Sequence, residues 1–169
     1  MIFARFGVDG SHVAPAAHNG FWEVSVRPEA EGSSPLLIRE ARPSDAEELI
    51  VFVRRMIRDP GIDLALSPGE FVLTPKQESR LLADYAASDN SIYLVAEMEG
   101  TIGGTLVCTG SKRRVNRHRA TLGGLCVAPE WRSRGIGSAL IENALQWAKA
   151  TDIVTRLELY VFAENWSAI

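Results

Sequence analysis

Hydrophobic and polar positions follow two different periods along this chain. Residues 43–59 repeat apolar side chains at the spacing of a helix that buries one face. The members of that stripe are Ala46, Leu49, Ile50, Val53 and Ile57. A second helix is predicted over residues 74–88, where Thr74 is placed to cap it and Pro75 takes the first helical position. The first part of the domain is therefore expected to contribute a helical pair.

Elsewhere the apolar residues alternate with polar ones or form short continuous runs, which is typical of strands. Strands are predicted over residues 36–42, 91–98, 101–109, 120–128 and 155–163. Glu99 and Gly100 are expected to form a hairpin turn, and a third helix runs from a loop at 129–135 to about Ala150. The order βααβββαβ predicts an α/β (α+β) fold, with a mixed sheet and helices on both faces.

Residues 1–35 are unlike the rest of the chain. They hold scattered Gly, Ala and Pro residues and close with "EAEGSSP", a linker-like stretch. The segment "GFWEVSVRP" fits a short strand, but nothing in the sequence indicates its partner. We therefore predict an irregular or partly disordered extension over residues 1–35 and one domain over residues 36–169.

Composition and charge narrow the class of protein. With 169 residues, 46% hydrophobic and 23% charged, the chain suits a single globular domain. A net charge of −3 argues against nucleic acid as the main partner. No apolar run is long enough for a membrane, and the first residues lack the apolar block of a secretory signal, so a cytoplasmic location is expected.

The two cysteines give no sign of a disulfide or a metal site. Cys108 and Cys126 both fall in predicted strands, and neither has a His or Cys neighbour at ligand spacing. Both are interpreted as small buried hydrophobic residues, and no metal site is predicted.

The loop before the third helix carries the clearest chemical signal. Gly135 and Gly137 lie one residue apart behind Arg132 and Arg134, and an apolar helical pattern starts at once. A helix N-terminus offers unpaired N–H groups that favour anions, and glycine lets the backbone approach a phosphate. By itself the motif fits a phosphate-bearing ligand and, equally, a loop whose glycines only turn the chain.

Two familiar phosphate loops fit this stretch poorly. A Walker loop needs Gly-Lys-Ser/Thr, and no Lys follows Gly137. A dinucleotide fingerprint needs a third glycine, where Leu140 stands, and should follow its strand directly, whereas residues 128–133 intervene here.

The stretch "VAPEWRSRGIGSALI" resembles the coenzyme A loop of the GNAT superfamily, the Gcn5-related N-acetyltransferases. The signature of that family, Arg/Gln-x-x-Gly-x-Gly/Ala, is matched by Arg132, Gly135 and Gly137. The order of the predicted elements agrees as well, so the resemblance covers roughly residues 36–169. It implies the acyl-CoA N-acyltransferase fold, with a mostly antiparallel central sheet, and acetyl-CoA as co-substrate.

The resemblance also implies a set of coenzyme-binding residues. They are Leu125, Val127, Arg132, Arg134, Gly135, Ile136, Gly137, Ser138 and Asn165. The backbone amides of residues 134–138 would hold the pyrophosphate, and residues 125–127 would lie beside the pantetheine arm, in a slot made where this strand separates from the one after the helix. Gly123 and Gly124 permit a bulge there. The backbone N–H of Cys126 is the candidate for polarising the thioester carbonyl.

Direct attack of an amine on the thioester needs a group that takes the amine proton. Many relatives carry a glutamate early in the strand before the loop, and the matching position here is Thr121. Glu97, His118 or a chain of water molecules are the candidates to replace it. For His118 a solvated loop histidine is the alternative interpretation.

Relatives continue after the position of Asn165 with a helix that carries a tyrosine and a Gly-Phe pair, and then with further strands. The sequence given stops at Ile169, so the resemblance implies a fold that lacks its last helix and strands. Leu157, Leu159 and Val161 are then expected to be partly exposed. An uncovered sheet edge would favour association, and a homodimer is therefore expected.

The function predicted is transfer of an acetyl group from acetyl-CoA to a primary amine of an unidentified acceptor. The alternative is a catalytically inactive acyl-CoA-binding module of the same fold. A third interpretation uses the basic segment 111–119 to bind RNA, but no aromatic residues interleave there for base stacking, and a solvated loop explains it.

Overall fold

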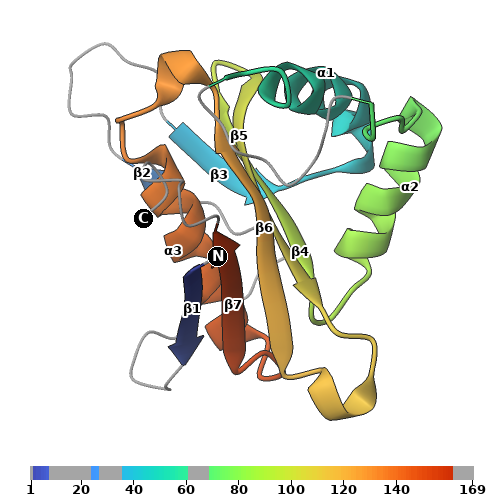
Figure 1. Ribbon diagram of the computed structural model, residues 1–169, viewed down its shortest axis with the longest axis vertical. Coiled ribbons are helices and arrows are strands. Elements are labelled where there is room, and N and C mark those ends of the chain that lie inside the picture. The colour runs from blue at the N-terminus through green and yellow to red at the C-terminus, as the bar shows by residue number, and fades with distance from the viewer. Residues whose placement is uncertain (1, 8–23, 27–35, 61–68, 162–169) are drawn as a thin grey trace.

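The computed structural model describes residues 2–7, 24–26, 36–60 and 69–161, which form one seven-stranded sheet with helices on both sides (Figure 1). The strands are β1 (Ile2–Gly7), β2 (Val24–Val26), β3 (Leu36–Glu40), β4 (Ile92–Met98), β5 (Thr101–Gly110), β6 (Arg119–Val127) and β7 (Arg156–Val161). They lie in the order β1-β7-β6-β5-β4-β3-β2. Neighbours are antiparallel, except β6 and β7, which are parallel.

Three α-helices cover the sheet. They are α1 (Ala46–Met56), α2 (Pro75–Ala86) and α3 (Ile136–Ala150), with short 3-10 turns η1 (Pro43–Asp45), η2 (Arg114–Asn116) and η3 (Pro129–Trp131). None of the helices within the described ranges is long and apolar enough to cross a membrane. The predicted fold class is confirmed, and each element predicted between residues 36 and 161 is present.

Two hydrophobic cores lie on the two faces of the sheet because alternate strand residues point in opposite directions. On one face Leu94, Leu106 and Leu157 pack with the α3 residue Leu140. On the other face Val95 and Tyr93 pack with residues of α1 and α2. We call these the α3 face and the α1/α2 face.

Local capping and turn chemistry explain two of the correct predictions. The Thr74 hydroxyl accepts a hydrogen bond from the backbone N–H of Gln77, and the Gln77 side-chain oxygen accepts one from the Thr74 backbone N–H at 2.9 Å. This capping box fixes the start of α2. Glu99 and Gly100 both have positive φ, 54° and 74°, which matches the tight turn predicted between β4 and β5.

The N-terminal segment differs from the prediction of an irregular extension. Val24–Val26 forms β2, inside the stretch that fitted a short strand, and its partner is β3. Ile2–Gly7 forms β1, which was not predicted, and pairs antiparallel with the outer edge of β7. The sequence pattern could not show this pairing because the two strands lie at opposite ends of the chain. Residues 1, 8–23 and 27–35 lie outside the described part.

The expected exposure of β7 is wrong for Leu157, which is 0% exposed. Leu159 is half-buried against the same core, and the side chain of Val161 lies outside the described part. The reason is that α3 packs on this face of β7. The predicted open edge of β7 is also wrong, because β1 takes it, so the expected homodimer loses the surface on which it was predicted.

Candidate functional site

A bulge interrupts β6 at its two glycines. Thr105 lies opposite Cys126 and Val107 opposite Gly123, so one extra residue is present on β6. Gly124 has a φ of 59°, a left-handed conformation that glycine adopts without strain, and its carbonyl accepts a 2.8 Å hydrogen bond from the Thr105 hydroxyl. The bulge expected at this pair of glycines is confirmed.

Beyond the bulge β6 and β7 separate. Their parallel ladder runs from Arg119 opposite Arg156 to Leu122 opposite Leu159 and ends there, although β7 continues to Val161 (Figure 1). Within the described residues, Gly123–Val127 of β6 thus has no strand partner on the side of β7. The separation predicted for these two strands is confirmed, and it leaves backbone groups of β6 available at a sheet edge.

The same segment leads into a helix start with unpaired donors. Ser133 and Gly135 have φ values of 59° and 76° and turn the chain into α3. Gly135 is the N-cap, and as a glycine it has no side chain that could cap the helix. The first intrahelical hydrogen bond runs from the Ala139 N–H to the Gly135 carbonyl, so the N–H groups of residues 136–138 have no intrahelical acceptor. A Cβ added at Gly137 would meet nothing within 4 Å. This end of α3 can receive an anion.

The two arginines of the loop have different surroundings. Arg132 donates from Nε to the Val127 carbonyl at 3.0 Å and forms an ion pair with Asp59. It therefore braces the loop against the end of α1, beside the Arg55–Glu130 pair at 2.6 Å. Arg134 is exposed at the helix start. The predicted coenzyme-binding role thus fits Arg134 more directly than Arg132.

Both cysteines are buried and free. Burial raises the pKa of the Cys126 thiol to about 11 and that of Cys108 to about 12. Both thiols are therefore protonated at neutral pH, which removes them as nucleophiles. Cys126 lies opposite Thr105 of β5. Because the N–H of Ala128, two residues further on, donates to the Gly103 carbonyl of β5, the Cys126 N–H also points toward β5. The edge beside β7 is therefore formed by the backbone groups of Leu125 and Val127.

Neither predicted base, Glu97 nor His118, has a side chain that the structure sets aside for catalysis. The Glu97 carboxylate accepts a 2.7 Å hydrogen bond from Arg39, which also binds Asp45 at 2.7 Å. This buried network joins β3, η1 and β4. The His118 side chain is exposed, and its backbone carbonyl accepts from the N–H groups of Thr155 and Arg156.

Asn165, the remaining predicted coenzyme-binding residue, lies outside the described residues. Among the residues that the structure describes, no group of three or more His, Cys, Asp or Glu side chains gathers where it could hold a metal ion.

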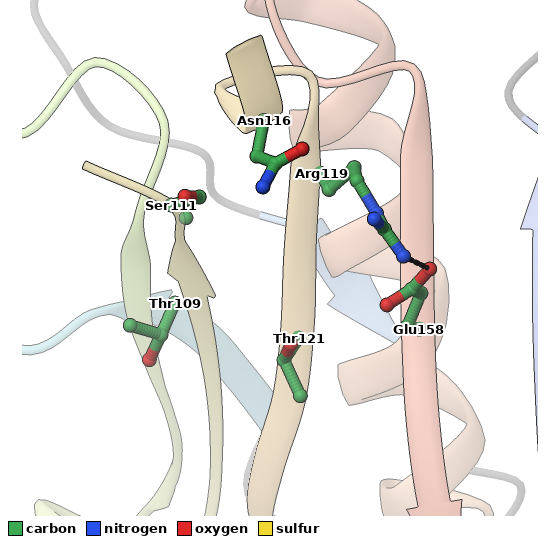
Figure 2. Close-up of a pocket in the computed structure, with 7 residues that line it drawn as sticks. Thr109, Ser111, Asn116, Arg119, Thr121 and Glu158 are labelled. Carbon is green, nitrogen blue, oxygen red and sulfur yellow. Dashed lines mark hydrogen bonds and ion pairs between the residues drawn. The ribbon is translucent and has the colours of Figure 1, made fainter. Parts of the chain in front are cut away.

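A pocket of about 210 Å³ lies at the other end of β6, where β5, β6 and β7 meet (Figure 2). Its lining residues are Thr109, Gly110, Ser111, Asn116, Arg119, Thr121 and Glu158. Thr109 lies opposite Thr121, and Thr121 opposite Glu158, so these three residues form one row across three strands. We call this the β5–β7 pocket.

Glu158 is the pocket residue that the sequence analysis missed. Its side chain is 5% exposed, and its carboxylate lies 2.6 Å from Arg119 and 3.7 Å from Arg156. The signal was a single acidic residue between Leu157 and Leu159, whose side chains pack on the α3 face. Thr121 occupies the position at which relatives were expected to carry a glutamate, and Glu158 supplies a carboxylate beside it from the neighbouring strand.

Comparisons with known proteins agree with this architecture. The model of the Acetyltransferase (GNAT) family matches residues 61–169. The L-amino acid N-acetyltransferase AaaT of Escherichia coli K12 is 36% identical over 76 residues, 45% of this chain and 46% of the relative. The chain thus spans about half the length of that curated relative.

Among solved structures, a GNAT-family acetyltransferase from Streptococcus pneumoniae has a TM-score of 0.74 and 36% identity, with 79% of this chain and 78% of that chain covered. A predicted acetyltransferase from Clostridium acetobutylicum, solved with acetyl-CoA, has a TM-score of 0.55 and 18% identity, with coverage of 78% and 84%. At that identity the second shares the fold alone.

Proposed function

Because the chain belongs to the GNAT acetyltransferase family, we propose that it transfers an acetyl group from acetyl-CoA to a primary amine. The observation that supports this most strongly is the separation of β6 from β7 after Leu122 and Leu159. It leaves an open strand edge at Gly123–Val127, which leads through a short loop to the unpaired N–H groups of α3. A ligand with both an amide arm and a pyrophosphate fits such a site.

Each part of the site has a distinct task in this proposal. The first-turn N–H groups of Ile136–Ser138 hold the pyrophosphate, and Arg134 adds positive charge. Residues 125–127 hydrogen-bond the amide arm as an added strand would. A backbone N–H of this open edge stabilises the negative charge that develops on the thioester oxygen.

The reaction joins a neutral amine nitrogen to the acetyl carbonyl carbon. A tetrahedral intermediate forms, the carbon–sulfur bond then breaks, and the sulfur leaves as the thiol. A neutral primary amine loses one proton in this reaction, and an ammonium group loses another before it, so a proton acceptor is needed near the acyl end of the site. Glu158 lines a pocket together with Thr121, which lies two residues before Gly123 of the bulge. The Glu97 carboxylate is instead bound by Arg39.

The acceptor class to test first comes from the Escherichia coli relative, whose name states that it acts on L-amino acids. We propose an acceptor of amino-acid type for this chain as well.

Thermal melting with and without acetyl-CoA tests the proposed coenzyme. A ligand that binds only the folded protein stabilises it by about 2.7 kcal/mol at a hundredfold excess over Kd. Dephospho-CoA and desulfo-CoA serve as controls, and thiol release with a panel of amines measures transfer. A cooperative melt that acetyl-CoA does not shift would contradict the proposal. A shift without transfer to any amine would support the inactive acyl-CoA-binding module instead.

A further inference from the structure

We propose that the β5–β7 pocket is the acceptor site, and that it selects amines that also carry a carboxylate, as α-amino acids do. Arg119 would bind the carboxylate and Glu158 the ammonium group. This inference rests on the proposed acetyl transfer and adds the residues that choose the acceptor.

The pocket lies on a direct path to the acyl end of the coenzyme slot. Thr121 lines the pocket. Gly123 and Gly124, which follow it after Leu122, are exposed at the bulge. A Cβ added at Gly123 would meet nothing within 4 Å. Bare backbone therefore connects the pocket with Leu125, where the unpartnered edge continues. At roughly 3.3 Å per residue, Thr121 and Leu125 are about 13 Å apart or less, because the bulge shortens the path.

The charges of the pocket favour a ligand that carries an anion. Arg119 and Arg156 lie opposite each other, with Glu158 close to both, so these three side chains sum to a charge of +1. The Arg119 side chain is 34% exposed and reaches the pocket, while Glu158 is 5% exposed. A guanidinium has five N–H donors, and Glu158 receives a bond from one end of it, Nη2. The remaining donors suit a carboxylate, which arginine can bind through two parallel hydrogen bonds.

An amino-acid zwitterion carries one group for each member of this ion pair, a carboxylate for Arg119 and an ammonium group for Glu158. When its carboxylate binds Arg119, Glu158 can turn to the ammonium group and accept one of its protons. The neutral nitrogen then attacks the acetyl carbon, the new carbon–nitrogen bond replaces the carbon–sulfur bond, and the second nitrogen proton ends on the departing sulfur. An amine without a carboxylate would have to separate Arg119 from Glu158 and leave the arginine without an anionic partner.

The other pocket walls are polar as well. Thr109, Ser111 and Asn116 present hydroxyl and amide groups, and Figure 2 shows them above and beside the Arg119–Glu158 pair. Such walls offer hydrogen bonds to a small polar side chain and little apolar surface to a large one. We therefore expect small polar amino acids to be preferred.

The competing explanation is that Arg119 and Glu158 only join β6 to β7. The two explanations predict different results when the pair is broken by mutation. The quantity that separates them is the preference of the enzyme for an amino acid over its carboxamide. A structural pair would, when broken, weaken catalysis with both substrates alike. A recognition pair would, when broken, remove the preference itself.

The test measures kcat/KM for each standard L-amino acid and its carboxamide at saturating acetyl-CoA. The proteins compared are the wild type, R119Q, R119K and E158Q, with R113Q as a control at an exposed arginine that does not line the pocket. The wild type should prefer the amino acid at least about thirtyfold, since losing a partner of a buried charge has a large effect. R119Q should raise the acceptor KM at least about tenfold and abolish the preference, and R119K should keep part of it.

Coenzyme binding separates the possible failures. The KM for acetyl-CoA and the melting shift with acetyl-CoA should be unchanged in R119Q and R113Q. Equal kcat/KM for amino acids and carboxamides in the wild type, or an unchanged preference in R119Q, would overturn the inference while acetyl transfer stands. If acetyl-CoA does not bind the wild type, the proposed function itself has failed, and this inference with it.

Discussion

The two ends of β6 offer their ligands different kinds of chemistry. Its C-terminal end presents backbone: an unpartnered edge at Gly123–Val127 and the bare N–H groups of α3. Its N-terminal end presents side chains, above all Arg119, which meets Glu158 of β7 in the β5–β7 pocket. Backbone donors persist through most substitutions, which suits a ligand that stays the same. Side chains change readily, which suits a site where the acceptor is chosen.

Arginine shows the same contrast. At the C-terminal end Arg132 binds Asp59 and the Val127 carbonyl, so its guanidinium stabilises the loop from behind. At the N-terminal end Arg119 lines the pocket itself and meets a carboxylate there. The same residue type thus supports a loop in one region and lines the proposed acceptor pocket in the other.

The largest effect on activity is expected at Gly123, where the two regions meet. The change Gly123→Val places a branched side chain in space that is open in the protein. We expect kcat/KM to fall at least about a hundredfold, because small displacements of reacting groups have effects of that size. The melting temperature should stay within about 4 °C, since no existing contact is lost.

A matched control for Gly123→Val is Thr101→Val, an exposed strand position at the β4–β5 turn. It should leave both activity and melting unchanged. If Gly123→Val retains full activity, the acyl group and the acceptor do not meet at the bulge.

A second effect separates the bracing arginine from the exposed one. Arg132→Ala should lower the free energy of unfolding by about 1–3 kcal/mol, because hydrogen bonds between charged groups are lost around Asp59. Denaturant titration measures this change. An unaltered midpoint would show that the Arg132–Asp59 pair contributes nothing to the loop.

Arg134→Ala should have a smaller effect, on coenzyme binding alone. An exposed charge contributes about 0.2–1 kcal/mol, so Kd for acetyl-CoA should rise by about 1.4- to fivefold at low salt, and less at high salt. Calorimetric titration at two salt concentrations provides the measurement. A loss of stability, or a salt-independent loss of affinity, would contradict this assignment.

The smallest effect concerns Glu78, a second buried carboxylate on the α1/α2 face. One of its oxygens, Oε2, has no hydrogen-bond partner within the described residues, and burial raises the pKa of its carboxyl group. In the folded state this group holds its proton to higher pH than in the unfolded chain. Stability should therefore fall as pH rises from the ordinary carboxyl pKa through the raised one.

Glu78→Gln removes that charge and should flatten the pH dependence, with a gain of up to about 1 kcal/mol at neutral pH and none in acid. Melting curves at acid and neutral pH measure it. Equal pH profiles for the two proteins would show that this carboxylate does not limit stability.

Features whose signal is local could be predicted from the sequence. Helical stripes, the capping box at Thr74 and the paired glycines of β6 are each contained in a few consecutive residues, so they predicted the elements and the bulge. The predicted coenzyme loop also rests on a compact motif, at Arg132, Gly135 and Gly137, and its role stays a prediction.

The missed features join residues that are distant in the chain. The Arg119–Glu158 pair spans 39 positions and the Arg132–Asp59 pair 73. No periodicity encodes which strands become neighbours, so Glu158 could not be placed beside Thr121, nor β1 beside β7. Residue type alone suggests Glu97 as a base, and its sequence neighbours do not show that Arg39 binds its carboxylate.

Backbone hydrogen exchange on the full chain tests the division of β6 most directly. On addition of acetyl-CoA the account predicts slower exchange at residues 123–127 and 134–138, with no change at residues 109–111 and 119–121 of the β5–β7 pocket. Addition of an N-acetyl amino acid should then slow exchange in the pocket. Protection of the pocket by acetyl-CoA alone, without any at the loop, would contradict the assignment of the coenzyme to the C-terminal end of β6.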